Sequence, residues 1–218
     1  MNRYKAAIFD LDGTLADTVK SIAVSCNKVL TACGLRERPV EEYNYYAGDG
    51  VNELIKRALH AAGDKECIHY DKALALYKVI FEEYCTYQVK AYDNMKETLE
   101  YMKDKGIRIA VLTNKPHDRG ITVVESLYGK AFFDDILGQQ EGIPRKPDPK
   151  GALILASRFN VKPSECIYVG DTNVDMQTGN GAGMCTVGVL WGFRGRKELE
   201  ENHAQIIIGR PEELKDLV

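Results

Sequence analysis

The chain has 218 residues, of which 44% are hydrophobic, and its formal net charge at pH 7 is -3. This length suits one large domain, or one domain with a smaller insert, around an ordinary packed core. The small charge gives no field that would attract nucleic acid or an anionic membrane, so we expect neither partner. No apolar stretch approaches the length of a membrane span, and the first five residues lack the apolar core of a signal peptide. We therefore expect a cytoplasmic protein, either a monomer or a homodimer.

Six short apolar runs have the length of buried strands. They are Ala6–Phe9, Ile107–Leu112, Asp135–Leu137, Cys166–Val169, Cys185–Leu190 and Gln205–Ile208. Helical spacing of apolar residues lies between them, over residues 95–105, 118–128, 149–159 and 174–181. Alternating strands and helices predict right-handed crossovers, and hence an α/β fold with a Rossmann-like parallel sheet.

Residues 17–90 interrupt this alternation, because their apolar spacing is helical and no strand is convincing. We therefore expect a core domain of residues 1–16 and 91–218, with an α-helical cap domain of residues 17–90 inserted after the first strand. Ligands of open α/β sheets bind at the carboxyl ends of the strands. An insert that leaves the sheet at that point is a candidate lid.

Asp10 and Asp12 follow the first strand directly, and their i, i+2 spacing points both carboxylates to one side of an extended chain. Two adjacent acids do not both ionise easily, which suits one ionised nucleophile and one general acid. Gly13 permits a sharp turn, and Thr14 offers a hydroxyl. An Asp-rich turn that merely closes the strand is the alternative interpretation.

The string Asp10-Leu-Asp12-Gly-Thr-Leu resembles the first motif of the haloacid dehalogenase-like phosphohydrolases. Shorter strings follow in the order that this family has, and each comes after a predicted strand or in a loop. They are Thr113-Asn114-Lys115, Arg145-Lys146-Pro147-Asp148-Pro149 and Gly170-Asp171-Thr-Asn-Val-Asp175. Each is weak alone, but the ordered set is specific and spans nearly the whole chain.

The second and third strings supply hydrogen-bond donors and positive charge. The Thr113 hydroxyl and the Asn114 backbone N–H suit a phosphoryl oxygen, although an isolated string of this kind is more often an ordinary turn. The Lys146 ammonium can offset the carboxylates and the substrate phosphate. We interpret Arg145 as a solvated charge or a contact to the lid.

The last string adds acidic groups, and carboxylates that converge on Asp10 form a hard-oxygen site suited to Mg²⁺. The resemblance implies that the metal ligands are Asp10, the backbone carbonyl of Asp12, and Asp171. It implies that Asp175 supports these ligands without binding the metal itself.

The resemblance also implies a mechanism for a small phosphorylated metabolite. Asp10 would attack phosphorus and form an aspartyl-phosphate, and Asp12 would act first as general acid and then as general base. Thr113, Asn114 and Lys146 would stabilise charge on the phosphoryl oxygens.

Substrate choice is expected to lie in the insert. Gly48 and Gly50 precede a predicted helix, where backbone amides can meet an anion, although an ordinary interhelical turn is an equal alternative. This segment and the string Thr113–Pro116 resemble phosphoglycolate phosphatases, which suggests that Arg57 contacts the substrate. A pyrophosphatase, a nucleotidase and a β-phosphoglucomutase are alternatives on the same fold. A non-catalytic phosphometabolite-binding protein is a more distant alternative, which the presence of Asp10, Asp12 and Lys146 disfavours.

Overall fold

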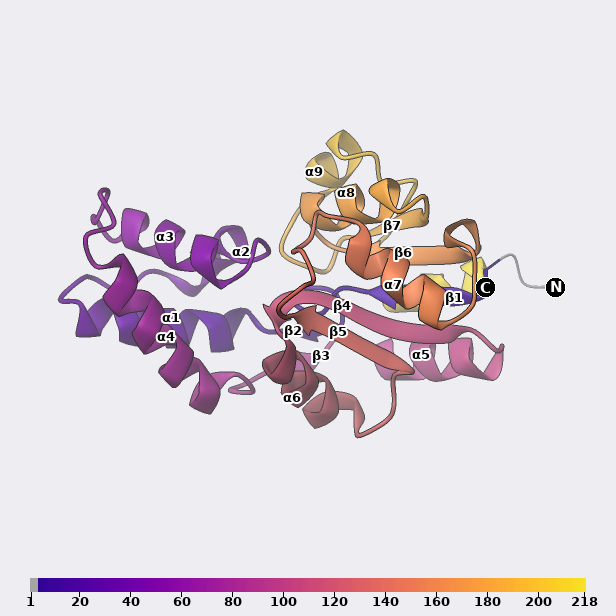
Figure 1. Ribbon diagram of the computed structural model, residues 1–218, viewed down its shortest axis with the longest axis horizontal. Coiled ribbons are helices and arrows are strands. Elements are labelled where there is room, and N and C mark those ends of the chain that lie inside the picture. The colour runs from indigo at the N-terminus through magenta and orange to yellow at the C-terminus, as the bar shows by residue number, and fades with distance from the viewer. Residues whose placement is uncertain (1–3) are drawn as a thin grey trace. The chain divides into compact units, whose positions relative to one another are not determined.

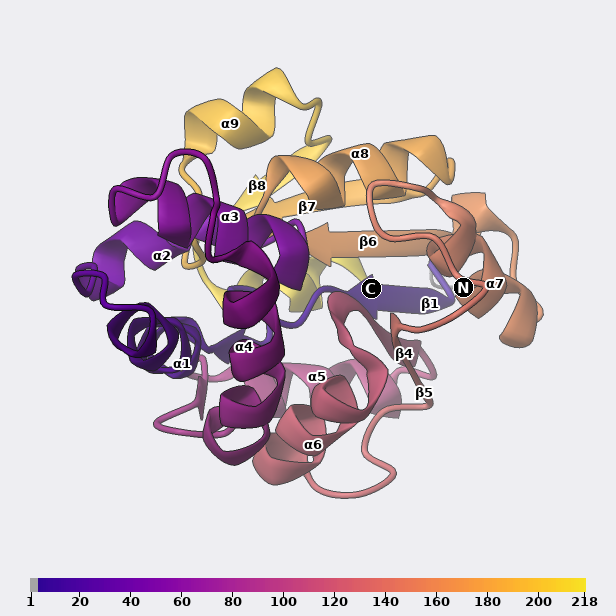
Figure 2. The same cartoon turned by 60° about the vertical axis from the view of Figure 1, so that its left-hand side comes forward.

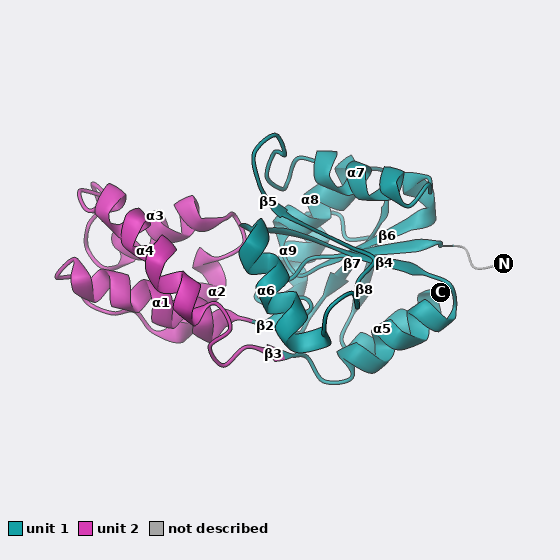
Figure 3. Ribbon diagram, turned by 60° about the horizontal axis from the view of Figure 1, so that its bottom comes forward, with its two compact units in different colours: residues 1–17, 91–218 teal, residues 18–90 magenta. Residues whose placement is uncertain are grey.

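The computed structural model describes residues 4–218, which divide into two compact units (Figures 1 and 3). Unit 1 contains the residues up to Asp17 and those from Ala91 onward, and unit 2 contains Thr18–Lys90. The chain passes between the units through two short strands, β2 (Ala16–Asp17) and β3 (Lys90–Ala91), which form a two-stranded sheet.

Unit 1 is built on a six-stranded sheet in the order β5-β4-β1-β6-β7-β8. Its strands are β1 (Ala6–Phe9), β4 (Arg108–Pro116), β5 (Asp135–Gln139), β6 (Cys166–Gly170), β7 (Cys185–Val189) and β8 (Ile206–Ile208). Each of the five neighbouring pairs is parallel. The predicted α/β fold with a Rossmann-like parallel sheet is therefore confirmed.

The strand order fixes where a ligand can bind. From β1 the chain winds outward through β4 and β5, and it then returns to the other side of β1 to form β6, β7 and β8. Figure 2 shows β1 between β4 and β6. The carboxyl ends of these three strands therefore surround the topological switch point, which is the usual ligand site of such sheets.

Helices cover both faces of this sheet (Figure 3). Helices α5 (Met95–Asp104) and α6 (His117–Tyr128) lie on one face, and α7 (Lys150–Arg158) and α8 (Asn173–Gly181) lie on the other. Helix α9 (Arg196–Glu201) and the 3-10 segments Pro163–Glu165 and Pro211–Leu217 complete the unit. The strands read as nearly continuous apolar runs because both faces are buried.

The core beneath α7 shows this directly. Alternate residues of the central strands, such as Ile8, Leu112 and Tyr168, pack with Leu155 of α7. β1 is completely buried along its length. Burial on both faces stabilises the strand ends that carry the acidic residues, so the site rests on a completely buried strand of the sheet.

Unit 2 is helical. It contains α1 (Val19–Ala32), the 3-10 turn Val40–Glu42, α2 (Tyr43–Tyr46), α3 (Val51–Ala61) and α4 (Tyr70–Tyr84). α1 and α3 both pack against α4. The stacked rings of Tyr77 and Phe81, with centroids 5.0 Å apart, contribute to its interior.

Two details differ from the sequence prediction. The second strand of the chain's main sheet was expected to end at Leu112, but β4 continues to Pro116 with a register shift after Leu112. Thr113 and Asn114 therefore lie within an irregular strand end and not in a loop after it. β5 likewise extends to Gln139. Polar residues can continue these strands because the neighbouring backbone supplies the hydrogen bonds.

Two further features concern the helices and the cysteines. None of the helices between Tyr4 and Val218 has the length and hydropathy needed to cross a bilayer. All six cysteines are free thiols.

The packing of α8 on the sheet gives a testable prediction. A Cβ on the buried Gly179 would come within 2.5 Å of the Thr186 Cγ2 and 2.8 Å of the Tyr168 Cβ. We expect Gly179→Ala to lower the free energy of unfolding by about 1–3 kcal/mol, although alanine favours helices. Urea denaturation measures this change. Gly195→Ala is the control, because a Cβ there meets no atom within 4 Å, and an equal loss in the two variants would contradict the packing argument.

Candidate active site

A buried lysine joins two carboxylates at the switch point. Asp10 directly follows β1, and its backbone N–H donates to the Val169 carbonyl of β6 at 2.9 Å. The Lys146 ammonium lies 2.7 Å from Asp10 Oδ1 and 2.8 Å from Asp175 Oδ1. Only 4% of the Lys146 side chain is exposed. The ammonium therefore depends on these carboxylates for its hydrogen bonds.

Asn114 fixes the position of Lys146. The Lys146 backbone N–H donates to Asn114 Oδ1 at 2.9 Å, and Asn114 Nδ2 donates to the Lys146 carbonyl at 3.1 Å. The peptide bond from Lys146 to Pro147 is cis. The predicted donor Asn114 thus ties the end of β4 to the loop that carries the lysine.

Asp171 and Asp175 enter the site from the end of β6 and the start of α8. Thr14 Oγ1 donates to Asp171 Oδ1 at 2.9 Å, and the Phe193 backbone N–H donates to Asp171 Oδ2 at 2.7 Å. Asp175 is the third residue of α8, where its Oδ2 accepts from the Thr172 N–H and hydroxyl in a capping box. The helix start therefore holds the Asp175 carboxylate in one orientation.

Glycines let these carboxylates approach the backbone closely. Gly13 has a φ of +88°, and a Cβ there would lie 2.3 Å from Asp171 Oδ2. A Cβ on Gly170 would lie 2.2 Å from the Asp175 Cβ. Gly13 and Thr14, which we expected to bind substrate, therefore both pack on or hydrogen-bond to Asp171 in this structure.

Burial and mutual repulsion raise the pKa values of the acids. Burial and the charge of Asp175 raise the pKa of Asp10 well above its ordinary value. The same two causes raise the pKa of Asp171 to about 7. Burial alone would lower the pKa of Lys146, but its contacts with Asp10 and Asp175 raise it, so the ammonium stays charged. One ammonium cannot neutralise three carboxylates, which is why the acids retain protons more strongly than usual.

This donor set fits a divalent cation. Asp10, Asp171 and Asp175 each offer an oxygen within 4.8 Å of the others, and all three residues are buried. Hard cations such as Mg²⁺ prefer carboxylate oxygens, and a bound cation relieves the repulsion that raises the pKa values. Asp175, predicted as a supporting residue, lies in the same cluster, and its two oxygens accept hydrogen bonds from Lys146 and Thr172.

Asp12 has a separate partner, Lys115, which the sequence did not single out. Lys115 Nζ lies 2.8 Å from Asp12 Oδ1, and 4% of the Lys115 side chain is exposed. The Lys115 backbone N–H donates to Thr113 Oγ1 at 3.1 Å. A hydroxyl that accepts a hydrogen bond keeps its own hydrogen, so Thr113 can still donate to a phosphoryl oxygen. The signal was present in the string Thr113-Asn114-Lys115, but a lysine in a strand is usually solvated.

The predicted residues of unit 2 form a local cluster of their own. Gly48 and Gly50 have φ values of +114° and +84°, and Gly50 immediately precedes α3. Arg57 pairs with Asp49 at 2.6 Å and donates to the Tyr45 and Tyr46 carbonyls at 3.3 and 3.1 Å. Arg57 therefore braces the glycine-containing loop. Arg145 of unit 1 donates to Gln139 Oε1 at 3.0 Å.

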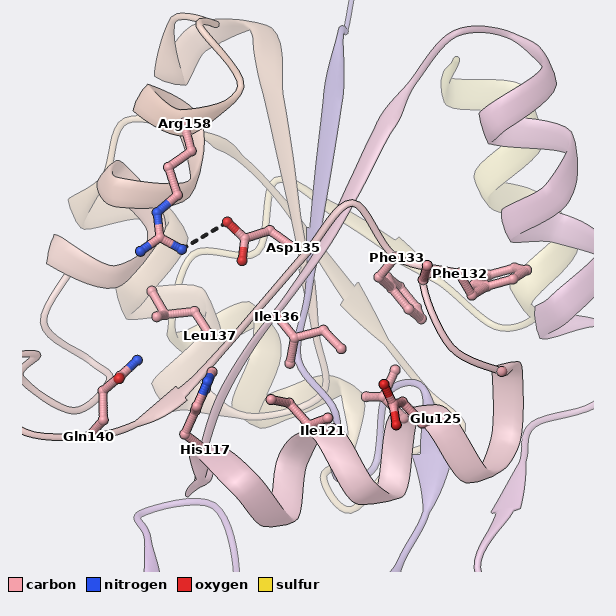
Figure 4. A pocket seen from close by; sticks show the side chains of 13 residues that line it. His117, Ile121, Glu125, Phe132, Phe133, Asp135, Ile136, Leu137, Gln140 and Arg158 are labelled. Atoms are coloured by element: carbon pink, nitrogen blue, oxygen red, sulfur yellow. Dashed lines mark hydrogen bonds and ion pairs between the residues drawn. The ribbon is translucent and has the colours of Figure 1, made fainter.

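A separate hollow of about 400 Å³ lies along the edge strand β5 (Figure 4). Ile121 of α6, Ile136 of β5 and Phe133 contribute apolar lining, and the ion pair of Asp135 and Arg158 lies on its other side. It contains none of the residues predicted for catalysis or binding. The acidic cluster and this hollow are therefore distinct features of unit 1.

A doubly wound parallel sheet with acids at its switch point places the chain among the α/β proteins that bind ligands at their strand ends, and comparisons with known proteins identify the family. The family model for haloacid dehalogenase-like hydrolases matches residues 7–189. The chain belongs to this family.

Several relatives match along the whole chain. The phosphoglycolate phosphatase of Mannheimia succiniciproducens is 31% identical and covers 100% of this chain and 98% of its own. The phosphoglycolate phosphatase of Aquifex aeolicus is 29% identical, and the match covers 98% of this chain and 96% of that protein. The crystal structure of a predicted phosphoglycolate phosphatase from Haemophilus somnus is similar, with a TM-score of 0.92, 25% identity, and 100% and 99% covered.

The raised pKa of Asp171 predicts how pH changes the stability of the metal-free protein. The folded protein holds this proton up to about pH 7, whereas an unfolded aspartate releases it near pH 4. The stabilisation is therefore complete below pH 4 and disappears as the pH rises through 7. Between pH 5 and 7.5 wild type should lose about 2–3 kcal/mol more free energy of unfolding than Asp171→Asn.

Urea denaturation in EDTA at both pH values measures this difference. The Asp171→Asn variant removes the titration of Asp171 together with its repulsion of Asp10, so the subtraction reports Asp171 and the acid coupled to it. Equal losses in the two proteins would show that Asp171 titrates normally.

Proposed function

We propose that this protein is a Mg²⁺-dependent phosphatase that hydrolyses phosphoglycolate through an aspartyl-phosphate on Asp10. Its family, together with phosphoglycolate phosphatase relatives of about 30% identity along the chain, makes it a phosphatase. The observation that carries the proposed chemistry is the buried contact of Lys146 with Asp10 inside the carboxylate cluster. This contact places the nucleophilic oxygen of Asp10 and the positive charge of Lys146 next to each other, where the phosphoryl group would bind.

In the first step Asp10 attacks the substrate phosphorus, and the bond from phosphorus to the leaving oxygen breaks. Asp12 donates a proton to that oxygen, so that an alcohol leaves and not an alkoxide. In the second step Asp12 removes a proton from water, whose oxygen attacks the phosphorus of the aspartyl-phosphate. Inorganic phosphate leaves, and the Asp10 carboxylate is restored.

The surrounding residues stabilise the charge that moves during these steps. The Lys146 ammonium, the Thr113 hydroxyl and the Asn114 backbone N–H serve the phosphoryl oxygens. Asp10, Asp171 and the Asp12 backbone carbonyl would hold Mg²⁺, supported by Asp175. The bound metal would offset the repulsion between nucleophile and phosphate.

Unit 2 is the proposed cap, and its loop with Gly48 and Gly50 is the proposed source of substrate selection. A small substrate that carries both a phosphate and a carboxylate matches the relatives' substrate and the cationic Arg57. The expected cytoplasmic location, and the expectation of a monomer or homodimer, remain predictions.

The first test is Mg²⁺-dependent release of inorganic phosphate from phosphoglycolate. Wild type should be active and should lose activity in EDTA. Asp10→Asn should reduce kcat by at least about a thousandfold, because the amide is no nucleophile. Pyrophosphate, nucleoside monophosphates and sugar phosphates, assayed in parallel, should give lower kcat/KM values. A higher kcat/KM for any of these would reassign the substrate, and an active Asp10→Asn would refute the mechanism.

The second test concerns Arg57. If its guanidinium binds the substrate carboxylate, Arg57→Ala should raise KM for phosphoglycolate about 10- to 100-fold with a smaller effect on kcat. Lys56→Ala is the matched control, since the exposed Lys56 pairs with Glu53 in the same helix. Asp49→Asn separates binding from loop bracing, because it breaks the ion pair but keeps the guanidinium. An unchanged KM in Arg57→Ala would remove Arg57 from the binding site.

A further inference from the structure

Lys115 is a buried cation that the proposed mechanism does not use. It lies near the carboxyl end of β4, next to β1 in the sheet, and its side chain is almost completely buried. A buried ammonium is stable only with a close anionic or hydrogen-bonding partner. The carboxylate of Asp12, 2.8 Å away, is such a partner.

The two buried lysines contact different acids. Lys146 contacts Asp10 and Asp175, whereas Lys115 contacts Asp12. Asp12 does not belong to the three-carboxylate cluster of Asp10, Asp171 and Asp175. The side chain of the second aspartate of the opening motif therefore has a partner of its own outside the cluster that is suited to a metal.

Lys115 is itself held in place. Its backbone N–H donates to Thr113 Oγ1 at 3.1 Å, in the part of β4 where the register shifts. The preceding residue, Asn114, is fixed by its two hydrogen bonds to the Lys146 backbone. The ammonium of Lys115 therefore projects from a braced segment, so its contact can define the rotamer of Asp12.

We infer that Lys115 is a positioning residue, which acts through Asp12 by placing its carboxylate to donate a proton to the leaving oxygen and then to remove a proton from the attacking water. This inference rests on the proposed function, in which Asp12 is the general acid and base. Each residue of the string Thr113-Asn114-Lys115 then has a role, because Thr113 and Asn114 donate to the phosphoryl oxygens and Lys115 positions Asp12. The structural alternative is that the pair only stabilises the fold, and the chemical alternative is that Lys115 binds substrate directly.

The leaving group distinguishes these possibilities. The glycolate oxygen needs a proton in order to leave, whereas p-nitrophenolate is a stable anion that leaves without one. Loss of Asp12 positioning should therefore slow the first step for phosphoglycolate and spare it for p-nitrophenyl phosphate. General acid catalysis contributes about 10²–10⁴-fold, so we expect Lys115→Met to slow glycolate release by about 10- to 100-fold.

The experiment is rapid-quench and stopped-flow measurement of the first turnover with Mg²⁺. In Lys115→Met the rate of the p-nitrophenolate burst should stay within about threefold of wild type, and KM for phosphoglycolate should change little. The exposed Lys96 supplies the control variant Lys96→Met, which should match wild type. Equal slowing of both leaving groups would overturn the inference.

A double-mutant cycle keeps the test decisive if Lys115→Met folds poorly. The double variant Asp12→Asn with Lys115→Met removes both charges of the pair, so no unpaired carboxylate is left buried. If Lys115 acts only through Asp12, adding Lys115→Met to Asp12→Asn should change glycolate release by less than about threefold. A further loss as large as in the single variant would show direct substrate binding. Wild type that does not hydrolyse phosphoglycolate would refute the proposed substrate, and the cycle then proceeds with another alkyl phosphate that the enzyme accepts.

Discussion

The contact of the Lys146 ammonium with Asp10 and Asp175 is the interaction on which the rest of the site depends. It joins the end of β1, the loop before α7 and the first turn of α8. Burying an ion pair is costly, so the surrounding chain must satisfy every group in it. Asn114 does so for the lysine backbone, and Thr172 does so for the second oxygen of Asp175.

The acidic groups of this site outnumber its one ammonium. Three carboxylates meet one ammonium, and burial raises the pKa of Asp10 and of Asp171. Gly13 and Gly170 allow the carboxylates to approach the backbone more closely than any side chain would permit. The same crowding that disfavours the metal-free acids is suited to binding a divalent cation, so local instability and the proposed catalysis have one physical cause.

Sequence patterns predicted the sheet well, because strands buried on both faces are almost purely apolar and the helices between them follow the 3.6-residue period. They were less informative where polar residues continue a strand, as at Thr113 in β4. The grouping of Asp10 with Asp171 was expected from strand ends that share one edge. The pairing of Lys115 with Asp12 was not, since the sequence alone does not reveal whether a lysine is solvated or buried. Arg57 shows the same limit, because its contacts with Asp49 and two carbonyls depend on the loop conformation.

The central claim is that Asp10 carries the phosphoryl group. Asp12→Asn with ³²P-labelled p-nitrophenyl phosphate tests it most directly, because this leaving group needs no acid and breakdown of the intermediate lacks its base. After acid quench, label should appear on the peptide that contains Asp10, in proportion to the p-nitrophenolate burst, and hydroxylamine should remove it. Release of p-nitrophenolate without labelled protein, or label on a residue other than Asp10, would contradict the account.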